Sequence, residues 1–556
     1  MSWNAASPRS PRTVPNSANA TSELLVRRLE RHTVRAPAEH GHSLQVPALA
    51  NARPLVGTNR SLLKSWNIEL AGRPLAMLRE QLRGELPRLA LQHTRRYRDV
   101  SPAGWDDQSL LLSGHQPRLF HPGVWFKNYA LSSLGQYGIG TPINLVVDND
   151  LCGLPAIAVP VIHQGRTAFA NCHYDQSSDN VPFELSRLVD ESTFRSFPER
   201  LGQLLEPLVA VPLVHQLWEH WSALPSDLRG NLGLGLAAAR HKLEADFGWQ
   251  TLELPLSQLC RTEAFACFLA ELLLRAKELR TIHNSALDEY RRLNRIRSKS
   301  HPVPALALEG NWCEVPFWVY SAAKPRRQRL FVQATGAGLE LSDRDGWSLT
   351  LDKLRLTEQL QQLLQGPVCI RTRALTTTLF SRVLACDLFL HGIGGAKYDE
   401  LTNEIGQQFF GMPLPAFMTL TATVRLPGHE RPTTAADVVR HEVLQRELRY
   451  HPEQHLNPAD TAAAAKWVAA KRHLLATRGS NSNLKSWQRE LEQVDAALEP
   501  YVARTAKQLA AEIERLSEVQ QCDAVLGSRE ISLCCFDAGL PAQIAAAARN
   551  HSSASR

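Results

Sequence analysis

The chain has 556 residues and a formal net charge of +7 at pH 7, and 44% of its residues are hydrophobic and 21% are charged. This length predicts two to four folding units, and the composition is that of globular proteins with a large core. No stretch approaches the roughly 20 consecutive apolar residues of a membrane helix, so we expect no membrane partner.

The ten cysteines form no CxxC pair and show no zinc-knuckle spacing. The first twenty residues are rich in Ser, Pro, Asn and Arg and lack the apolar run of a signal peptide. We therefore expect reduced thiols, no bound metal and a cytoplasmic location. The positive charge suits anionic small molecules as well as nucleic acid, but no nucleic-acid-binding motif is visible, so we expect small-molecule substrates and no nucleic-acid partner.

The first predicted elements have the order of a doubly wound α/β sheet. Residues 58–93 are predicted to be helical because leucines recur at helical spacing. Ser109–Ser113 is predicted to be a buried strand, and a polar loop and a helix follow it. Ile143–Asp150 is predicted to be a second buried strand, and Ala156–Ile162 a third with Pro160 at a bulge or an edge. The alternation of strand, loop, helix and strand predicts a Rossmann-like core.

The remaining segments complete the predicted organisation. A long helical pattern covers 262–297, strands with glycine turns follow, and 367–425 returns to α/β character. We predict four regions: a disordered or extended tail at 1–45, a Rossmann-like core with connecting segments at 46–425 that includes a helical insertion at about 200–300, a helical coiled-coil region at 426–525, and a segment at 526–556 that returns to the core and ends in a disordered tail.

The coiled-coil prediction comes from an apolar seam with 3,4 spacing. It begins with Leu484, Trp487, Leu491, Val494 and Leu498. Pro500 lies inside the run and should kink or split the helix.

A second arm at 459–478 would form an antiparallel hairpin with this helix, although an ordinary helical bundle is the alternative. The second arm is shorter and would leave Leu509, Ile513 and Leu516 uncovered. We therefore predict a homodimer through this stripe.

The segment Gly114–Gly123, GHQPRLFHPG, carries the most chemical information. It lies between a predicted strand and a predicted helix, where doubly wound folds bind anions at helix N-termini. We assign His115 and His121 as candidate catalytic residues, because mobile positive charge stabilises the negative charge that acyl activation builds up. The candidate substrate or nucleotide ligands of this region are Gly114, Gln116, Arg118 and Lys127. The alternative is a polar turn in which His115 bonds to the backbone.

Two further segments supply candidate site residues. Asp148 and Asp150 are candidate catalytic carboxylates and Asn149 a ligand, because the carboxyl ends of parallel strands meet at one crevice. Gly394, Gly395 and Lys397 are candidate nucleotide ligands, since glycines permit close backbone approach to a ligand. The alternatives are an Asx turn and a plain connecting turn.

These segments, in this order, resemble the bacillithiol biosynthesis cysteine-adding enzyme family. That family is expected to show a GQQ-x-GL-x-TGP turn after its first core strand, an EDHD-like run after the next, an Arg-Pro-Leu stretch, a Gly-Gly loop and a terminal LQER-like segment. The matching residues here are Gly114, Gln116, Leu119, Asp148, Asp150, Arg373, Leu375, Gly394, Gly395, Leu526 and Arg529. His115 stands where glutamine is usual, and the run at 148–150 lacks the glutamate and histidine.

The resemblance implies a Rossmann-like core, a dimerising coiled coil, and ligation of L-cysteine to the amine of glucosaminyl-malate. It also implies that Arg373 binds substrate. Amide formation from a carboxylate needs activation, so ATP or another nucleotide is an expected cofactor. The departures from the family pattern predict a diverged substrate. Two alternatives are a nucleotidyltransferase-like, adenylate-forming enzyme for another small acid and a non-catalytic assembly protein that uses the coiled coil.

Overall fold

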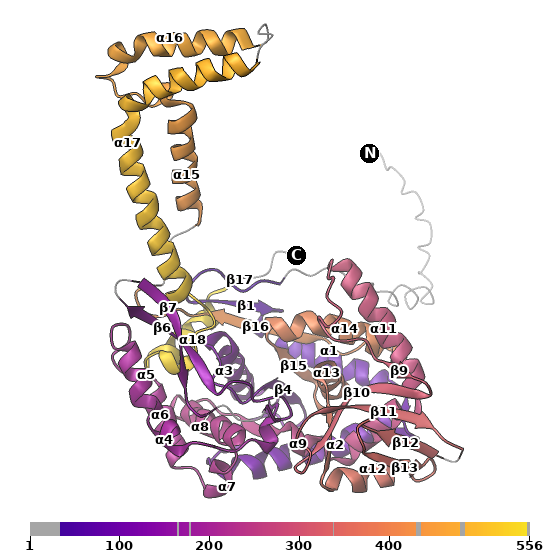
Figure 1. Cartoon of the computed structure of the whole chain (residues 1–556). Helices are drawn as coiled ribbons and strands as arrows, with labels where there is room; N and C mark the ends of the chain where they lie inside the picture. The colour runs from indigo at the N-terminus through magenta and orange to yellow at the C-terminus, as the bar shows by residue number, and fades with distance from the viewer. Residues whose placement is uncertain are drawn as a thin grey trace, which may run out of the picture.

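The computed structural model describes residues 34–163, 166–176, 180–336, 338–429, 435–478 and 484–552 (Figure 1). The fold is mixed α/β, with a mostly parallel central sheet, a second sheet that is antiparallel, and a helical arm that projects from the core. No helix in these described ranges is both long enough and apolar enough to cross a membrane. Of the predicted tails, residues 1–33 and 553–556 lie outside the described residues.

The central sheet has seven strands in the order β17–β1–β16–β15–β4–β5–β8. Strands β16, β15, β4, β5 and β8 are parallel, and β1 pairs antiparallel with β16. Their bounds are β1 (His42–Val46), β4 (Leu110–His115), β5 (Thr141–Val146), β8 (Leu252–Pro255), β15 (Leu388–His391), β16 (Phe417–Thr423) and β17 (His551–Ser552). The first two predicted buried strands are β4 and β5, which are parallel neighbours with Leu110 opposite Thr141 and His115 opposite Val146.

Helices cover both faces of this sheet, which explains three consecutive leucines in β4. Leu110 and Leu112 pack in one core with α2 (Leu75–Thr94) and α10 (Glu263–Leu274), whereas Leu111 packs in the other core with α3 (Pro122–Gln136). The other helices around the sheet are α1 (Ala52–Ser65), α4 (Glu191–Arg195), α5 (Phe197–Leu205), α6 (Val214–Ser222), α7 (Ser226–Arg229), α8 (Leu232–Asp246), α9 (Leu256–Leu259), α11 (Ala276–Leu293), α13 (Ala374–Phe380), α14 (Ile393–Phe410) and α18 (Leu540–Arg549).

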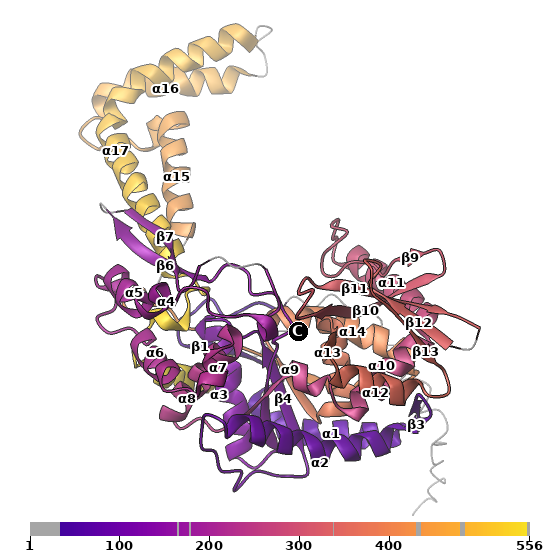
Figure 2. The ribbon, with the colours of Figure 1, turned by 60° about the horizontal axis from the view of Figure 1, so that its bottom comes forward.

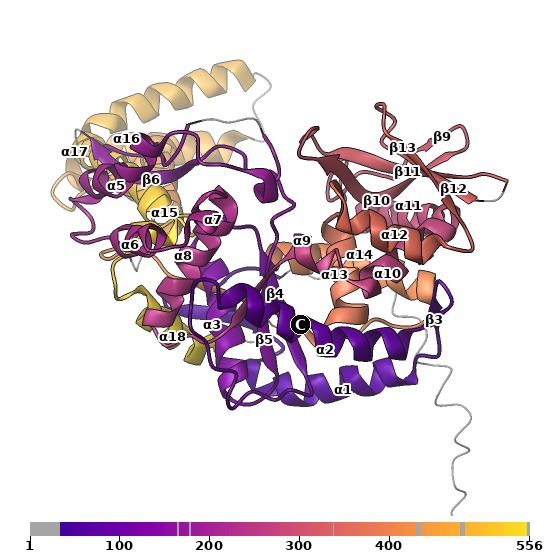
Figure 3. The same cartoon turned by 90° about the horizontal axis from the view of Figure 1, so that it is seen from below.

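The second sheet lies beside the carboxyl-end loops of the central sheet, as Figures 2 and 3 show. Its strand order is β13–β12–β11–β10–β14, and α12 (Leu356–Gln365) packs on it. The strands are β9 (Leu308–Glu309), β10 (Trp312–Ser321), β11 (Gln328–Ala334), β12 (Gly338–Ser342), β13 (Ser348–Asp352) and β14 (Val368–Thr372). Two separate hairpins are β2 (Glu69–Leu70) with β3 (Arg73–Pro74), and β6 (Ala156–His163) with β7 (Arg166–His173).

The structure differs from the predicted regions in three places. The end of the tail predicted at 1–45 forms β1, which pairs with β16 and β17 of the central sheet. The helical insertion predicted at about 200–300 contains β8, the outer strand beside β5. The strand predicted at Ala156–Ile162 exists, but it pairs with β7 outside the central sheet. In the first case the partner β16 is distant in sequence, and in the second the strand is only four residues long. In the third, strand periodicity predicts a strand but not the sheet it joins.

Three helices build the arm: α15 (Ala435–Tyr450), α16 (Thr461–Thr477) and α17 (Leu484–Leu526). The first part of α17 packs on α16, and the second part packs on α15. Figure 1 shows that α17 changes direction between these parts, and Pro500 lies there, as the predicted kink requires. The predicted turn at 479–483 lies outside the described residues.

The apolar stripe that we expected to be uncovered has a partner within the chain. Leu509 packs with Leu448 of α15, and Ile513 lies against the same cluster. Leu509 is 8% exposed and Leu516 9% exposed. The predicted homodimer through this stripe therefore loses its basis, because α15, which the prediction did not treat as an arm of the hairpin, covers Leu509 and Ile513.

We predict that Leu509→Asp unfolds the arm rather than separating two subunits. The substitution buries a charge between α15 and α17, at a cost of about 2–4 kcal/mol. Circular dichroism should show lost helical signal and an early melting transition. The control is Leu484→Asp, at a position that is 64% exposed, which should melt like the parent chain. Equal melting of both variants would contradict the packing of α15 on α17.

Candidate functional site

The central sheet reverses its winding direction between β4 and β15. From β4 the chain adds β5 and β8 on one side, and later adds β15 and β16 on the other. Open α/β sheets bind ligands outside the carboxyl ends of their strands at such a switch point. His115 ends β4, His391 ends β15, and Asp148–Asp150 follows β5. The sequence-predicted segments therefore meet at the edge where this architecture binds ligands.

A cavity of about 360 Å³, here called the histidine pocket, lies beside the loop after β4. Its polar lining residues are His115, Arg118, His121, Cys152, Tyr174, Glu530 and Ser532. Glu530 comes from the C-terminal segment, which is held on the loop by a hydrogen bond from the Leu533 amide to the Phe120 carbonyl oxygen at 2.8 Å. Three of the predicted site residues thus share one pocket, which a segment some 400 residues later in the sequence closes.

His121 is both the N-cap of α3 and a wall of the histidine pocket. Its Nδ1 accepts a hydrogen bond from the Gly123 amide at 3.1 Å. The proton of the neutral ring is therefore on Nε2, which lies 3.7 Å from Oε2 of Glu530. Burial lowers the pKa of His121, and the Glu530 carboxylate opposes this shift. The ring presents a hydrogen-bond donor to the pocket.

His115 presents the opposite polarity. Its Nδ1 lies 3.1 Å from the Gln116 carbonyl oxygen, which can only accept, so the ring proton is on Nδ1. Its ring packs edge-on against Phe120. Burial and the nearby Lys127 ammonium lower the pKa of His115 to about 3. His115 is consequently neutral near pH 7, with Nε2 as an acceptor.

The loop after β4 is tied to the loop after β5. Gln116 Nε2 donates to Oδ2 of Asp150 at 3.0 Å, and Arg118 Nη2 donates to the Leu151 carbonyl oxygen at 2.8 Å. Asp150 also pairs with Arg327 of the second sheet at 3.2 Å. Asp150 therefore links the loop after β4 (residues 116–121, here called the histidine loop) to the turn before β11 of the second sheet.

Lys127 lies beneath the histidine loop. It is buried, and its Nζ donates to the Gly114 carbonyl oxygen at 2.9 Å. Burial and the Arg240 guanidinium lower the pKa of Lys127 to about 8. Arg240 in turn pairs with Glu244 at 2.7 Å and with Glu253, and all three are buried. Sequence reasoning missed this network, because its members are scattered over a helix and a strand that carry no motif.

Asp148 and Asn149 are buried and serve the packing of the site. Asp148 accepts hydrogen bonds from the amide and hydroxyl of Ser257 at the start of α9. Burial and the neighbouring Glu184 raise the pKa of Asp148 to about 7. Asn149 Nδ2 donates to the Thr372 carbonyl oxygen at 2.7 Å, which ties the loop after β5 to β14. Neither residue lines the histidine pocket.

The predicted residues of the later segments are not brought to this pocket either. Gly395 packs against His391, since a Cβ there would lie 2.7 Å from the His391 ring, and Gly394 is exposed. Lys397 is exposed on the second turn of α14. Arg373 is 12% exposed, pairs with Glu314 at 2.8 Å and stacks on Trp318. These residues have structural roles or face solvent, so their placement does not indicate where a nucleotide would bind.

Buried charge also surrounds His391. Its Nε2 donates to Asp399 at 2.9 Å, and Asp399 receives Arg382 at 2.7 Å and the Thr378 hydroxyl at 2.6 Å. Burial lowers the pKa of His391, whereas Asp399 and its hydrogen bond raise it. This cluster fixes the start of α14 beside the switch point.

Metal-binding and disulfide chemistry have no visible site in the described ranges. No group of three or more His, Cys, Asp or Glu side chains among the described residues could hold a metal ion. All ten cysteines are free thiols, and nine of them are buried. A comparison of the sequence with protein-family models gives no match, and a comparison with curated proteins gives none either.

We predict that His115 makes stability fall as the pH decreases. The unfolded chain binds a proton near the ordinary pKa of 6.5 and the folded chain only near 3, so stability is lost between these values, by up to about 1.4 kcal/mol per pH unit. His115→Asn keeps a donor to the Gln116 carbonyl but removes the titration. As the pH falls from about 7.5 to about 5, the free energy of unfolding should decrease more in the parent chain than in the variant, as measured by denaturant unfolding. A pH-independent difference would contradict a buried neutral His115.

Proposed function

We propose that the chain is a ligase-type enzyme that joins a small carboxylic acid to an amine, as the resemblance to the cysteine-adding family implies, with a diverged substrate. The observation that carries the proposal is that His115, Arg118 and His121 line one pocket at the carboxyl edge of the parallel sheet. The pocket volume of about 360 Å³ is at the small end of ligand sites, which suits a substrate the size of an amino acid. A Rossmann-like core agrees with the strand order at the switch point.

The charged lining residues of the histidine pocket would bind different groups of the two substrates. Arg118 supplies a guanidinium for the carboxylate of the acid, and Glu530 supplies a carboxylate for an ammonium group. In the acyl transfer, the amine nitrogen bonds to the activated carbonyl carbon, the leaving group departs, and the nitrogen loses a proton to an acceptor in the pocket. The Nε2–H of His121 donates to the oxygen on which negative charge develops. A nucleotide would supply the leaving group when bound.

The test is turnover of L-cysteine and glucosaminyl-malate with ATP, followed by mass spectrometry of the amide product. His121→Asn is the sharp variant, because Asn is a good N-cap and should retain the cap on Gly123 while it removes the imidazole donor. We expect turnover to fall about a hundredfold with an unchanged melting temperature.

His121→Ala is the matched control for the capping role. It removes the cap as well, at a cost of about 1 kcal/mol, and should lower the melting temperature in addition to the activity. If the parent chain forms no amide with any small amino acid, or if His121→Asn turns over at the parent rate, the proposed function fails.

Assembly through the arm is the second candidate function. Val439, Val443 and Tyr450 recur on one face of α15, and each is at least 50% exposed. Apolar stripes of this kind mark partner surfaces, and a second copy of the chain is the default partner. A homodimer through α15 is therefore proposed in place of one through Leu509 and Ile513.

We expect light scattering to show a dimer at micromolar concentration. Val439→Asp combined with Val443→Asp should halve the mass and leave the circular dichroism unchanged, because both side chains are exposed within one chain. A monomeric parent chain would exclude this candidate.

A further inference from the structure

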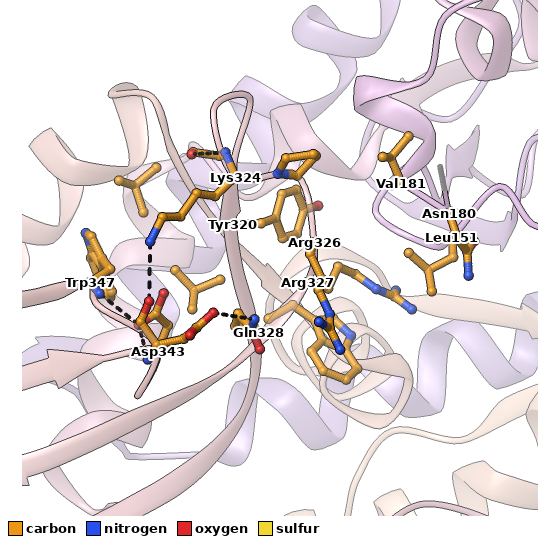
Figure 4. Close-up of a pocket in the computed structure, with 16 residues that line it drawn as sticks. Leu151, Asn180, Val181, Tyr320, Lys324, Arg326, Arg327, Gln328, Asp343 and Trp347 are labelled. Atoms are coloured by element: carbon orange, nitrogen blue, oxygen red, sulfur yellow. Dashed lines mark hydrogen bonds between the residues drawn. The ribbon is translucent and has the colours of Figure 1, made fainter. Parts of the chain in front are cut away.

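A cavity of about 690 Å³, here called the tryptophan pocket, lies outside the proposed acyl-transfer site. It lies between the β10–β11 turn of the second sheet and the loops after β5, and Figure 4 shows side chains from both elements around it. The lining residues used below are Leu151, Lys324, Arg326, Arg327, Asp343 and Trp347. Its volume is within the range of about 300–1,000 Å³ that small-molecule sites occupy, and is almost twice that of the histidine pocket.

One wall of the tryptophan pocket is cationic. Lys324, Arg326 and Arg327 follow one another closely in the β10–β11 turn. Arg326 is exposed and makes no hydrogen bond or ion pair with another described residue. Arg327 pairs with Asp150, but its buried Nε has no hydrogen-bond partner among the described residues. Two guanidinium groups with spare donors at the mouth of a cavity favour an anion with several oxygens.

The opposite wall offers an aromatic surface and an acceptor. The ring of Trp318 is already covered by Arg327 at 4.8 Å and Arg373 at 4.2 Å. Tyr320 is buried and donates its hydroxyl to Glu184, so the half-buried Trp347 is the more accessible ring for a ligand. Asp343 uses a single oxygen, Oδ1, for the amides of Asp345 at 2.7 Å and Trp347 at 2.9 Å. A planar ring and hydroxyl groups on the ligand would match these features.

We propose that the tryptophan pocket binds a nucleoside phosphate. Its phosphate oxygens pair with Arg326 and Arg327, its base packs on Trp347, and Asp343 accepts from its sugar hydroxyls. The inference goes beyond the proposed function: Leu151 lies between this nucleotide and the acid in the histidine pocket, so the nucleotide acts on that pocket through the loop and is not the source of the leaving group. The proposal puts the nucleotide beside the second sheet. The predicted nucleotide ligands Gly394, Gly395 and Lys397 of α14 line neither cavity.

Neighbouring residues of the loop after β5 line the two pockets, Leu151 the tryptophan pocket and Cys152 the histidine pocket, so we expect binding in one to be coupled to binding in the other. Leu151 lines the tryptophan pocket, and its carbonyl oxygen receives Arg118 from the side of the histidine pocket. Asp150 receives Arg327 at 3.2 Å and Gln116 at 3.0 Å. A phosphate that draws Arg327 away from Asp150 would change the position of Gln116, and by linkage the acid would change nucleotide affinity equally.

The experiment is calorimetric titration of the full chain with ATP and ADP. Arg326→Ala should weaken nucleotide binding roughly tenfold or more, because it removes a charge-assisted contact from an exposed side chain whose loss leaves the fold intact. Arg355→Ala is the matched control, since Arg355 is an exposed arginine near the same sheet that pairs with Glu358 and does not line the pocket. The control should bind as the parent does. A second titration with L-cysteine reports on the histidine pocket independently.

The outcomes separate the two proposals. Selective loss of nucleotide affinity in Arg326→Ala supports the tryptophan pocket, whether or not L-cysteine binds. Parent-like nucleotide affinity in Arg326→Ala overturns it, as does a parent chain that binds neither ATP nor ADP at millimolar concentration. Absence of L-cysteine binding together with Arg326-dependent nucleotide binding counts against the proposed ligase alone.

Discussion

The buried pairing of Arg240 with Glu244 and Glu253 is the interaction on which the site depends. It joins α8 to β8, and Glu244 also receives Trp125 at 2.7 Å and Asn128 at 2.8 Å from α3. Removing one member of such a network leaves an unpaired buried charge, which costs far more than the pairing contributes. The helix that follows the histidine loop is therefore fixed relative to the outer strand of the sheet.

Burial is the main cause of the lowered pKa values of His115 and Lys127, and the same guanidinium adds to it. Arg240 lies 5.6 Å from the ring centroid of Phe120, and its charge lowers the pKa of both His115 and Lys127. A neutral His115 costs less to bury than a cation, and a Lys127 with a pKa of about 8 can lose its proton more easily than an exposed lysine. The buried Lys127 and Arg240 add to the positive potential of the exposed Arg118 at this edge, and salt screens the buried charges weakly.

The sequence predicted those parts of the fold whose signal is local. The leucines of β4 and the apolar run of β5 specify buried strands, and the polar loop between β4 and α3 follows from the break in that pattern. The return of the C-terminal segment to the core was predicted, but the place of Glu530 in the histidine pocket was not, because it depends on how that segment docks on the loop after β4. Likewise Lys397 was misleading, since glycines before a helix indicate a turn but not which face of the helix carries the next lysine.

The loop after β5 connects several elements of the fold, although its short sequence carries no pattern that predicts these contacts. Asp148 is anchored to α9, Asn149 to β14, and Asp150 to both the histidine loop and the second sheet. Consecutive residues with three different partners cannot move independently, because their Cα atoms are only about 3.8 Å apart. The proposed coupling of the two ligand-sized cavities beside this loop therefore needs no large domain motion, because Leu151 and Cys152, which line one cavity each, are joined covalently.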